Sequence, residues 1–214
     1  MKIGFQHILT SSILLGLFAL VGTTIVAGLN LATKDRIAAN HEAMRLRNMN
    51  QVLSPENYDN EILKDKLVVS DEMLQTNGRP VTIYRARKDG QPVAAIFETV
   101  APKGYSGPIY LLVGVKLDGT LSGVRVLSHK ETPGLGDAIE LRHSDWVLGF
   151  NGKSLQNPPQ HLWAVKRDGG VFDQFTGATI SPRIVVKSIR NTLEYFAAHK
   201  TDIFPSLQTE QLPD

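Results

Sequence analysis

Cysteine is absent from this sequence of 214 residues. Iron–sulfur clusters and many structural zinc sites are held by cysteine thiolates, so neither kind of cysteine site can form within the chain. The absence is compatible with an oxidising compartment but does not require one. Histidine is scattered without the spacing of metal ligands, and we expect no metal site. His129 and His143 are expected to be surface or hydrogen-bonded residues, although both could join a nearby ligand site.

Charge is also absent between Lys2 and Lys34. The apolar run from Ile8 to Leu29 is long enough for a transmembrane helix, which needs about 20 residues. A cleaved signal peptide is the alternative, and the small residues Ala27 and Gly28 leave cleavage conceivable. A signal peptide usually has an apolar region of only about 7–15 residues, so the length favours a retained anchor in the lipid bilayer. We place it at residues 8–31, after a short terminus of residues 1–7.

The orientation of this anchor is poorly encoded. Only Lys2 and the α-amino group precede it, whereas Lys34, Arg36, Arg45 and Arg47 follow it. Because positive flanks tend to stay in the cytoplasm, the charge bias weakly opposes an external domain.

Strong charge imbalance is missing as well, since the formal net charge is +2. This balance gives no reason to propose a nucleic-acid surface. Residues 32–55 are polar with interspersed apolar positions, which indicates either a helical stalk that stops before Ser54-Pro55 or a solvated linker. Residues 56–214 contain no repeat or low-complexity tract and have a normal size for one domain.

Strand signals in this domain come in pairs around turn residues. Asp89-Gly90 and Asp118-Gly119 are typical hairpin turns, and apolar, β-branched runs flank each of them. The predicted strands cover residues 81–86, 93–98, 109–115 and 121–127, with a further short strand at 162–165. Helices are expected around Asp137 to Phe150 and at the end of the chain. The fold class is therefore α+β, with a single N-terminal transmembrane helix and one compact domain containing a mostly antiparallel sheet. Trp146 and Trp163 are expected in its core.

A hydroxyl-rich segment, Thr176-Gly177-Ala178-Thr179, carries the main functional signal. Glycine and alanine shield the backbone so little that a bulky group could approach either threonine closely. The same segment is also compatible with a plain strand-to-helix turn, in which both hydroxyl groups cap the backbone. The residues alone leave these two interpretations open.

A helix is expected to begin immediately after this segment. Ser181-Pro182 has the pattern of an N-cap followed by proline in the first helical position. Apolar residues at helical spacing form one stripe: Val185, Ile189, Leu193 and Phe196. The N-terminus of such a helix favours an anion near Thr179, for example a phosphate.

Asp173-x-x-Thr176-Gly177-Ala178-Thr179 resembles the signature of proteins that carry FMN covalently through a phosphoester to threonine. Gly104-Tyr105-Ser106-Gly107-Pro108 and Glu131-Thr132-Pro133-Gly134-Leu135-Gly136 precede it in the order found in G subunits of Rnf (Rsx) electron-transport complexes. The C subunit of the sodium-translocating NADH:quinone reductase is similar. Without the resemblance, both loops read as ordinary connections between strands.

The resemblance implies an FMN-binding domain with Thr179 as the covalent attachment residue. It implies cofactor-binding roles for Tyr105, Glu131, Thr132, Gly134, Leu135, Gly136, Thr176, Gly177 and Ala178. It further implies that a flavin transferase recognises Asp173 together with Thr176 to Thr179. The domain would be periplasmic and anchored in the bacterial inner membrane by one span, with residues 1–7 as a cytoplasmic N-terminus.

The function implied is a redox subunit that is not autonomous. It would relay electrons among other membrane and peripheral subunits of an Rnf complex, which couples ferredoxin and NAD redox to ion translocation. The alternative is a membrane-anchored FMN-binding sensor or regulatory module without a carrier role. A plain anchored interaction domain, the third possibility, would bind no flavin.

Overall fold

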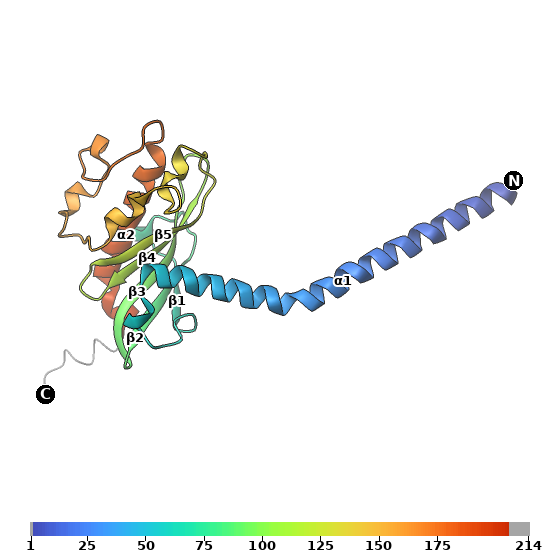
Figure 1. Ribbon diagram of the computed structural model, residues 1–214, viewed down its shortest axis with the longest axis horizontal. Coiled ribbons are helices and arrows are strands. Elements are labelled where there is room, and N and C mark those ends of the chain that lie inside the picture. The colour runs from blue at the N-terminus through green and yellow to red at the C-terminus, as the bar shows by residue number, and fades with distance from the viewer. Residues whose placement is uncertain (1, 206–214) are drawn as a thin grey trace. The chain divides into compact units, whose positions relative to one another are not determined.

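The structure of the protein is a computed structural model that describes residues 2–205 (Figure 1). Helix α1 spans Lys2–Val52, so the predicted anchor and the predicted helical stalk belong to one helix. The chain divides between Arg45 and Leu46 into two compact units. The apolar part of α1 belongs to the first unit, and the whole sheet domain belongs to the second.

The first unit contains a helix long and apolar enough to cross a membrane, with a mean hydropathy of 2.2 over its most apolar window. Its apolar side chains are exposed, as Phe18 at 77% and Leu15 at 74% illustrate. The hydroxyl groups of Thr23 and Thr24 donate to carbonyl groups one turn earlier. These two hydroxyl groups are thus satisfied inside the helix, as a hydrocarbon environment requires.

The second unit is built on a sheet of five strands in the order β1-β2-β3-β4-β5. Every neighbouring pair is antiparallel. The strands are β1 (Lys66–Val69), β2 (Val81–Lys88), β3 (Gln91–Ala101), β4 (Ile109–Lys116) and β5 (Leu121–Ser128). Both predicted hairpins are confirmed, and Asp89 and Gly90 have the positive φ angles, 51° and 76°, that suit the tight turn between β2 and β3. Strand β1, which is short and half-exposed, has no sequence prediction that corresponds to it.

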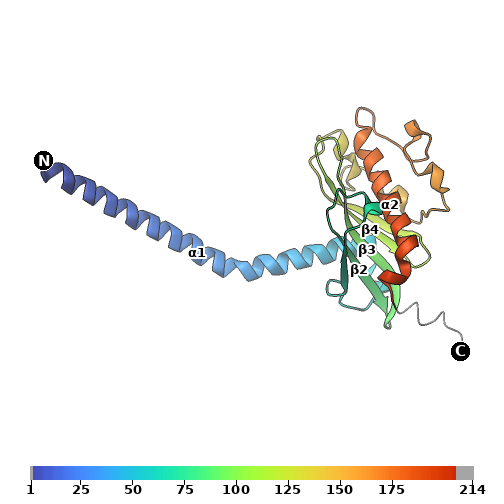
Figure 2. The same cartoon turned by 180° about the vertical axis from the view of Figure 1, so that it is seen from behind.

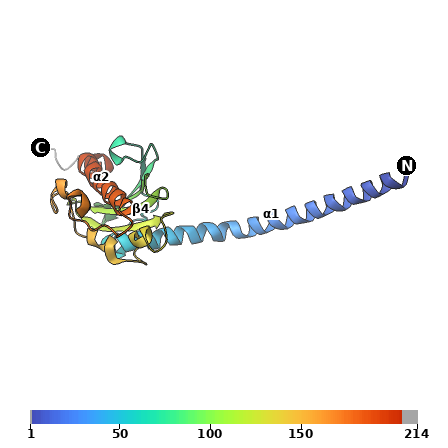
Figure 3. The ribbon, with the colours of Figure 1, turned by 90° about the horizontal axis from the view of Figure 1, so that it is seen from above.

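Helix α2, Ile180–Ile203, covers one face of the sheet (Figures 2 and 3). The predicted stripe is confirmed, because all four of its apolar residues are buried on this face: Val185, Ile189, Leu193 and Phe196. The opposite face packs against the end of α1 and the residue after it, where Met49, Val52 and Leu53 are buried. Side chains of successive strand residues alternate between the faces, so that Phe97 packs under α2 while Ile96 packs under the end of α1.

The described connections outside the sheet contain six short 3₁₀-helices among turns and irregular segments. They are η1 (Pro55–Asn57), η2 (Glu72–Leu74), η3 (Gly136–Ile139), η4 (Asp145–Phe150), η5 (Gln160–Leu162) and η6 (Lys166–Asp168). The helix expected around Asp137 to Phe150 is therefore wrong in type, since η3 and η4 are separate 3₁₀ turns. Ser144 starts η4 by accepting a hydrogen bond from the N–H of Trp146 at 3.1 Å.

The strand expected at residues 162–165 is wrong. Leu162 ends η5, and only Val165 forms an isolated bridge, to Phe172. Pro158 and Pro159 lack the N–H groups that a ladder needs, and the backbone bonds of this segment are local turns instead. The apolar signal there has another cause: Trp163 and Val165 are buried as core side chains.

Candidate functional site

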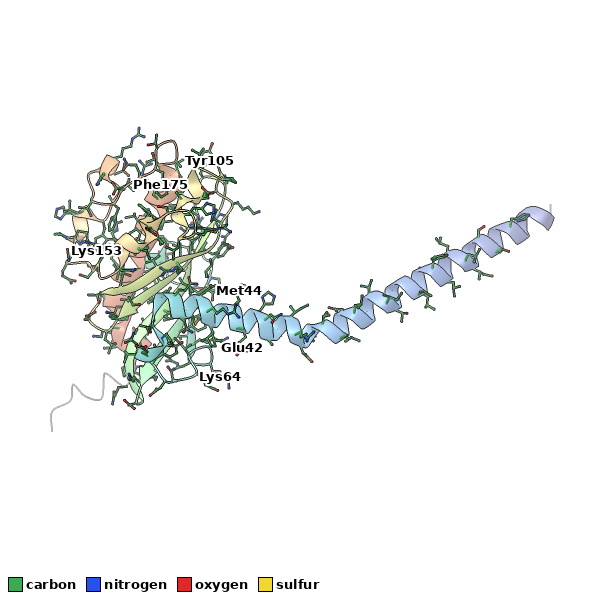
Figure 4. All side chains as sticks on the ribbon, viewed as in Figure 1. Glu42, Met44, Lys64, Tyr105, Lys153 and Phe175 are labelled. Atoms are coloured by element: carbon green, nitrogen blue, oxygen red, sulfur yellow. The ribbon has the colours of Figure 1, made fainter. Side chains whose placement is uncertain are left out.

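A cavity of about 460 Å³ opens at one end of the sheet domain. Three segments surround it: the turn between β3 and β4, the loop after β5, and the segment leading into α2. Its lining residues are Tyr105, Glu131, Thr132, Leu135, Gly136, Gly177, Ala178, Thr179, Ile180 and Ser181. Figure 4 shows Tyr105, from the first of these segments, at the upper end of the domain, where Phe175 also lies in that view.

The loop after β5 is a compact turn that presents Leu135. The backbone N–H groups of Leu135 and Gly136 both donate to the Thr132 carbonyl oxygen, at 3.2 and 3.1 Å. Gly134 supplies the positive φ of 76° that this turn requires. The Leu135 side chain is 45% exposed and faces Gly177, where an added Cβ would lie 3.4 Å from its Cδ2 atom. A leucine side chain and the bare backbone of Gly177 therefore form adjacent parts of the cavity wall.

Thr179 is the N-cap residue of α2, and its side chain makes no capping hydrogen bond. The expectation that Ser181 is the N-cap is wrong by two positions. The helix starts at Ile180, and the Ser181 hydroxyl donates instead to the Glu131 carboxylate. Among the described residues, the backbone N–H groups of Ile180 and Ser181 have no protein acceptor. A half-buried, uncapped hydroxyl thus lies beside free donors at the positive end of a helix.

Glu131 is the buried charge of the site, with only 4% of the residue exposed. Its Oε1 atom accepts from the Ser106 N–H at 2.9 Å, and its Oε2 atom accepts from the Tyr105 N–H at 3.2 Å and from Ser181. These donors come from two of the three segments that line the cavity, and Glu131 itself belongs to the third. Hydrogen bonds to a carboxylate offset the cost of burying its charge.

Two histidine–carboxylate pairs lie next to the loop after β5, outside the cavity lining. The Glu131 N–H donates to Nδ1 of His129, which leaves the other ring nitrogen of His129 facing Glu140 at 2.7 Å. His143 Nδ1 lies 2.6 Å from Asp137 Oδ2. The pKa of the Asp137 carboxyl lies below its ordinary value. The main cause is a hydrogen bond from the backbone N–H of Gly134, and the nearby His143 contributes as well. Neither histidine lines the cavity, and among the described residues no cluster suited to a metal ion is found.

Asp173 lies outside the cavity on an exposed segment. Its carboxylate is 2.5 Å from the Lys166 ammonium, and both side chains are mostly exposed. Its carbonyl accepts a hydrogen bond from the Trp146 indole at 2.8 Å. Trp146 is half-buried rather than a core residue like Trp163, because its ring packs edge-on against Phe150 and Phe175 near the surface. The aromatic cluster holds this segment against the domain.

The structure brings together most of the residues for which cofactor contact is predicted. One cavity is lined by Tyr105, Glu131, Thr132, Leu135, Gly136, Gly177, Ala178 and Thr179. Gly134 and Thr176 are not among its lining residues but adjoin Leu135 and Gly177 in the sequence. Their roles toward a cofactor stay predictions. Ile180 and Ser181 line the cavity without having been predicted. The Ser181 hydroxyl is the one sequence signal for a role at the site, but the Ser181-Pro182 pattern is equally typical of a helix N-cap.

Comparisons with known proteins agree in both parts of the chain. A family model described as the FMN-binding domain matches residues 104–194, and one described as the RnfG N-terminal region matches residues 1–52. Among curated proteins, the G subunit of the ion-translocating oxidoreductase complex of Pseudomonas aeruginosa is 49% identical over 195 residues, which is 91% of this chain and 91% of the relative. The chain belongs to the G-subunit family of ion-translocating oxidoreductase complexes.

Other members of the G-subunit family are similarly close. The protein of Pseudoalteromonas atlantica is 46% identical over 199 residues, covering 93% of each chain. That of Shewanella loihica is 46% identical over 195 residues, covering 91% of this chain and 92% of the relative. The similarity extends across the apolar helix and the sheet domain alike.

The cavity has the properties that an FMN site needs. Its volume falls within the usual range for small-molecule sites, about 300–1,000 Å³. Free N–H groups at the start of α2 suit a phosphate. Tyr105 and Leu135, exposed at 70% and 45%, offer flat and apolar surfaces to a ring system. The residues present therefore fit the cofactor that the matching domain model names.

Proposed function

We propose that the protein carries FMN covalently, through a phosphoester to the Thr179 hydroxyl. The observation that carries the proposal is the position of this hydroxyl, which lines the cavity, makes no capping bond and lies at the N-terminus of α2. The retained negative charge of the phosphodiester would be stabilised by the free N–H groups of Ile180 and Ser181 and by the helix dipole. A covalent tether keeps the cofactor in place where free flavin is scarce.

The chain's own residues would bind and orient the cofactor. Leu135 and Tyr105 contact the ring system, and Gly177 lets the backbone approach it closely because no Cβ intervenes. The phosphate end is fixed by Thr179. When bound, FMN supplies the capacity to accept and donate electrons, which no side chain of this chain provides.

We further propose that the domain relays electrons between neighbouring subunits of an Rnf-type complex. That complex would couple ferredoxin and NAD redox to ion translocation. The apolar part of α1 would anchor the protein in the bacterial inner membrane as a single span, with the flavin domain in the periplasm. The G-subunit names of its relatives and the exposed apolar surface of α1 support this assignment.

A flavin transferase would attach the cofactor by recognising Asp173 and Thr176 to Thr179. The segment is accessible, since Asp173, Thr176 and Gly177 are all exposed. Asp173→Asn should reduce the amount of attached flavin. Asp168→Asn, which breaks the neighbouring ion pair with Arg183, should leave it unchanged. Equal flavin attachment in the two variants and the wild type would remove Asp173 from the recognition signal.

The relay is tested in membranes that contain the whole complex. Thr179→Val keeps the size of the side chain but removes the acceptor oxygen. We expect it to assemble with the other subunits and to lose oxidation of the reduced donor by the acceptor. Full electron flux in assembled Thr179→Val complexes would exclude the tethered carrier. If the wild-type protein binds flavin, yet removal of that flavin leaves electron flux through the complex unchanged, the sensor or regulatory alternative holds instead.

A further inference from the structure

Glu131 holds the cavity together through contacts that involve no cofactor. Its carboxylate accepts hydrogen bonds from Tyr105 and Ser106 in the β3–β4 turn and from Ser181 in the first turn of α2. The donors are separated from Glu131 by 26, 25 and 50 residues along the chain. A single side chain therefore ties together all three segments that line the cavity.

The backbone around Glu131 is shaped to fit this side chain. A Cβ added at Gly104 would lie 2.9 Å from Glu131 Oε1, and also 2.3 Å from the Gly107 carbonyl oxygen. A Cβ added at Gly136 would lie 2.8 Å from Ser181 Oγ and 3.0 Å from Glu131 Cβ. A side chain at Gly104 would thus collide with the carboxylate, and a side chain at Gly136 would crowd Ser181 and the Glu131 side chain. The backbone on both sides is therefore closely packed against the Glu131 side chain.

The protein donors occupy most of what the carboxylate can accept. A carboxylate offers about four lone-pair positions, and three are used by Tyr105, Ser106 and Ser181. Little capacity remains for hydrogen bonds to a bound ligand. Its negative charge nevertheless stays at the cavity wall, 4% exposed, where low polarity lets it act on a nearby group more strongly than in water.

We infer that Glu131 is a positioning residue, which builds the cavity before FMN arrives and sets an electronegative wall beside it. This inference rests on the proposed FMN function for its second part only. The clamp between the three segments exists in the chain without cofactor. The charge should make reduction of a bound flavin less favourable, because added electrons would meet an existing negative charge.

Glu131→Gln is the direct test, because glutamine keeps the shape but replaces one acceptor oxygen with an NH₂ donor. In either orientation of the amide, its NH₂ group faces the backbone N–H of Tyr105 or of Ser106, so one of these N–H groups loses its acceptor. Amide hydrogen exchange of the full-length chain, made without the transferase, should be about tenfold faster at one of these residues, as expected for one lost charge-assisted hydrogen bond. Unchanged exchange at both amides in a folded variant would overturn the clamp.

Ser181→Ala and Ser188→Ala form a matched pair for the case in which Glu131→Gln does not fold. Both serines are buried on α2, but Ser181 donates to Glu131, whereas the Ser188 hydroxyl has no hydrogen-bond partner among the described residues. We expect faster exchange at Tyr105 and Ser106 in Ser181→Ala and wild-type exchange in Ser188→Ala. Identical behaviour of the two variants would contradict the clamp.

The midpoint potential of flavin in the FMN-loaded protein tests whether the Glu131 charge makes flavin reduction less favourable. Glu131→Gln should shift it upward, and Ser188→Ala should not shift it. An unchanged or lower potential in Glu131→Gln would refute the electronegative wall. If the wild-type chain holds no flavin, the proposed function fails, while the exchange measurement on the cofactor-free chain still decides the clamp.

Discussion

The indole Nε1 of Trp146 donates a hydrogen bond to the main-chain carbonyl of Asp173 across 2.8 Å. The same ring packs edge-on against Phe150 and Phe175, with centroid distances of 5.0 and 5.3 Å. The exposed segment before Thr176 is therefore fixed by its backbone, which leaves its side chains accessible to a partner such as the transferase.

Trp146→Phe should keep much of the ring packing but lose this hydrogen bond. We expect the free energy of unfolding to fall by about 1 kcal/mol, the usual net value of one such bond. Flavin attachment should slow, because the recognition segment is less ordered. Chemical unfolding and the time course of flavin attachment measure the two effects.

Lys166→Met is the control for the same segment, since it removes the ion pair with the Asp173 carboxylate. Both partners are more than half exposed, at 57% and 67%, so their pair adds little stability. The free energy of unfolding should change by less than about 0.5 kcal/mol. A loss as large as that of Trp146→Phe would mean that the ion pair fixes the segment as strongly as the indole does.

Gly177→Ala tests the backbone conformation at the cavity. Gly177 has a φ of 81°, which costs a residue with a side chain about 1–2 kcal/mol. We expect destabilisation of that size and less bound flavin, because the new methyl group lies against Leu135. Gly149→Ala is the matched control: Gly149 lacks a positive φ, and nothing lies within 4 Å of its added Cβ. Equal stability of the two variants would contradict a conformational requirement at Gly177.

Asp65 should make the free energy of unfolding depend on pH in the acidic range. Its carboxylate receives hydrogen bonds from Arg85 at 2.6 Å and Arg87 at 2.8 Å. Burial raises the pKa of Asp65, but these arginines outweigh it and hold the pKa below its ordinary value. Stability from this group is present above the unfolded pKa, about 3.9, and is lost as the pH falls through the lower folded pKa.

The measurement is urea unfolding of the wild type and Asp65→Asn at pH 6 and then at decreasing pH below about 4. The variant should be less stable than the wild type at pH 6 by about 2 kcal/mol, as expected for hydrogen bonds to a charged group. The difference should shrink as the wild-type carboxylate becomes protonated. A difference that stays constant with pH would mean that packing, not charge, explains the loss.

Local patterns predicted the hairpins and the apolar stripe of α2, because turn residues and side-chain spacing encode them directly. The segment around Trp163 was misjudged because its apolar residues pack into the core from irregular turns, which alternation in a short run cannot reveal. At the site, Ser181 illustrates the limit of local reasoning. Its hydroxyl matched a capping pattern, whereas a carboxylate 50 residues earlier is its acceptor. Long-range partners of this kind have no local signature.

The identity of the residue that carries the cofactor tests the central claim most directly. The full chain should be coexpressed with the flavin transferase, denatured on a gel, viewed under ultraviolet light and digested for mass spectrometry. We predict a fluorescent band with FMN on Thr179, loss of that band in Thr179→Val, and its retention in Thr132→Val, which alters another threonine of the cavity. A dark wild-type band, alongside a labelled positive control, would contradict covalent attachment, as would FMN mapped to a different residue.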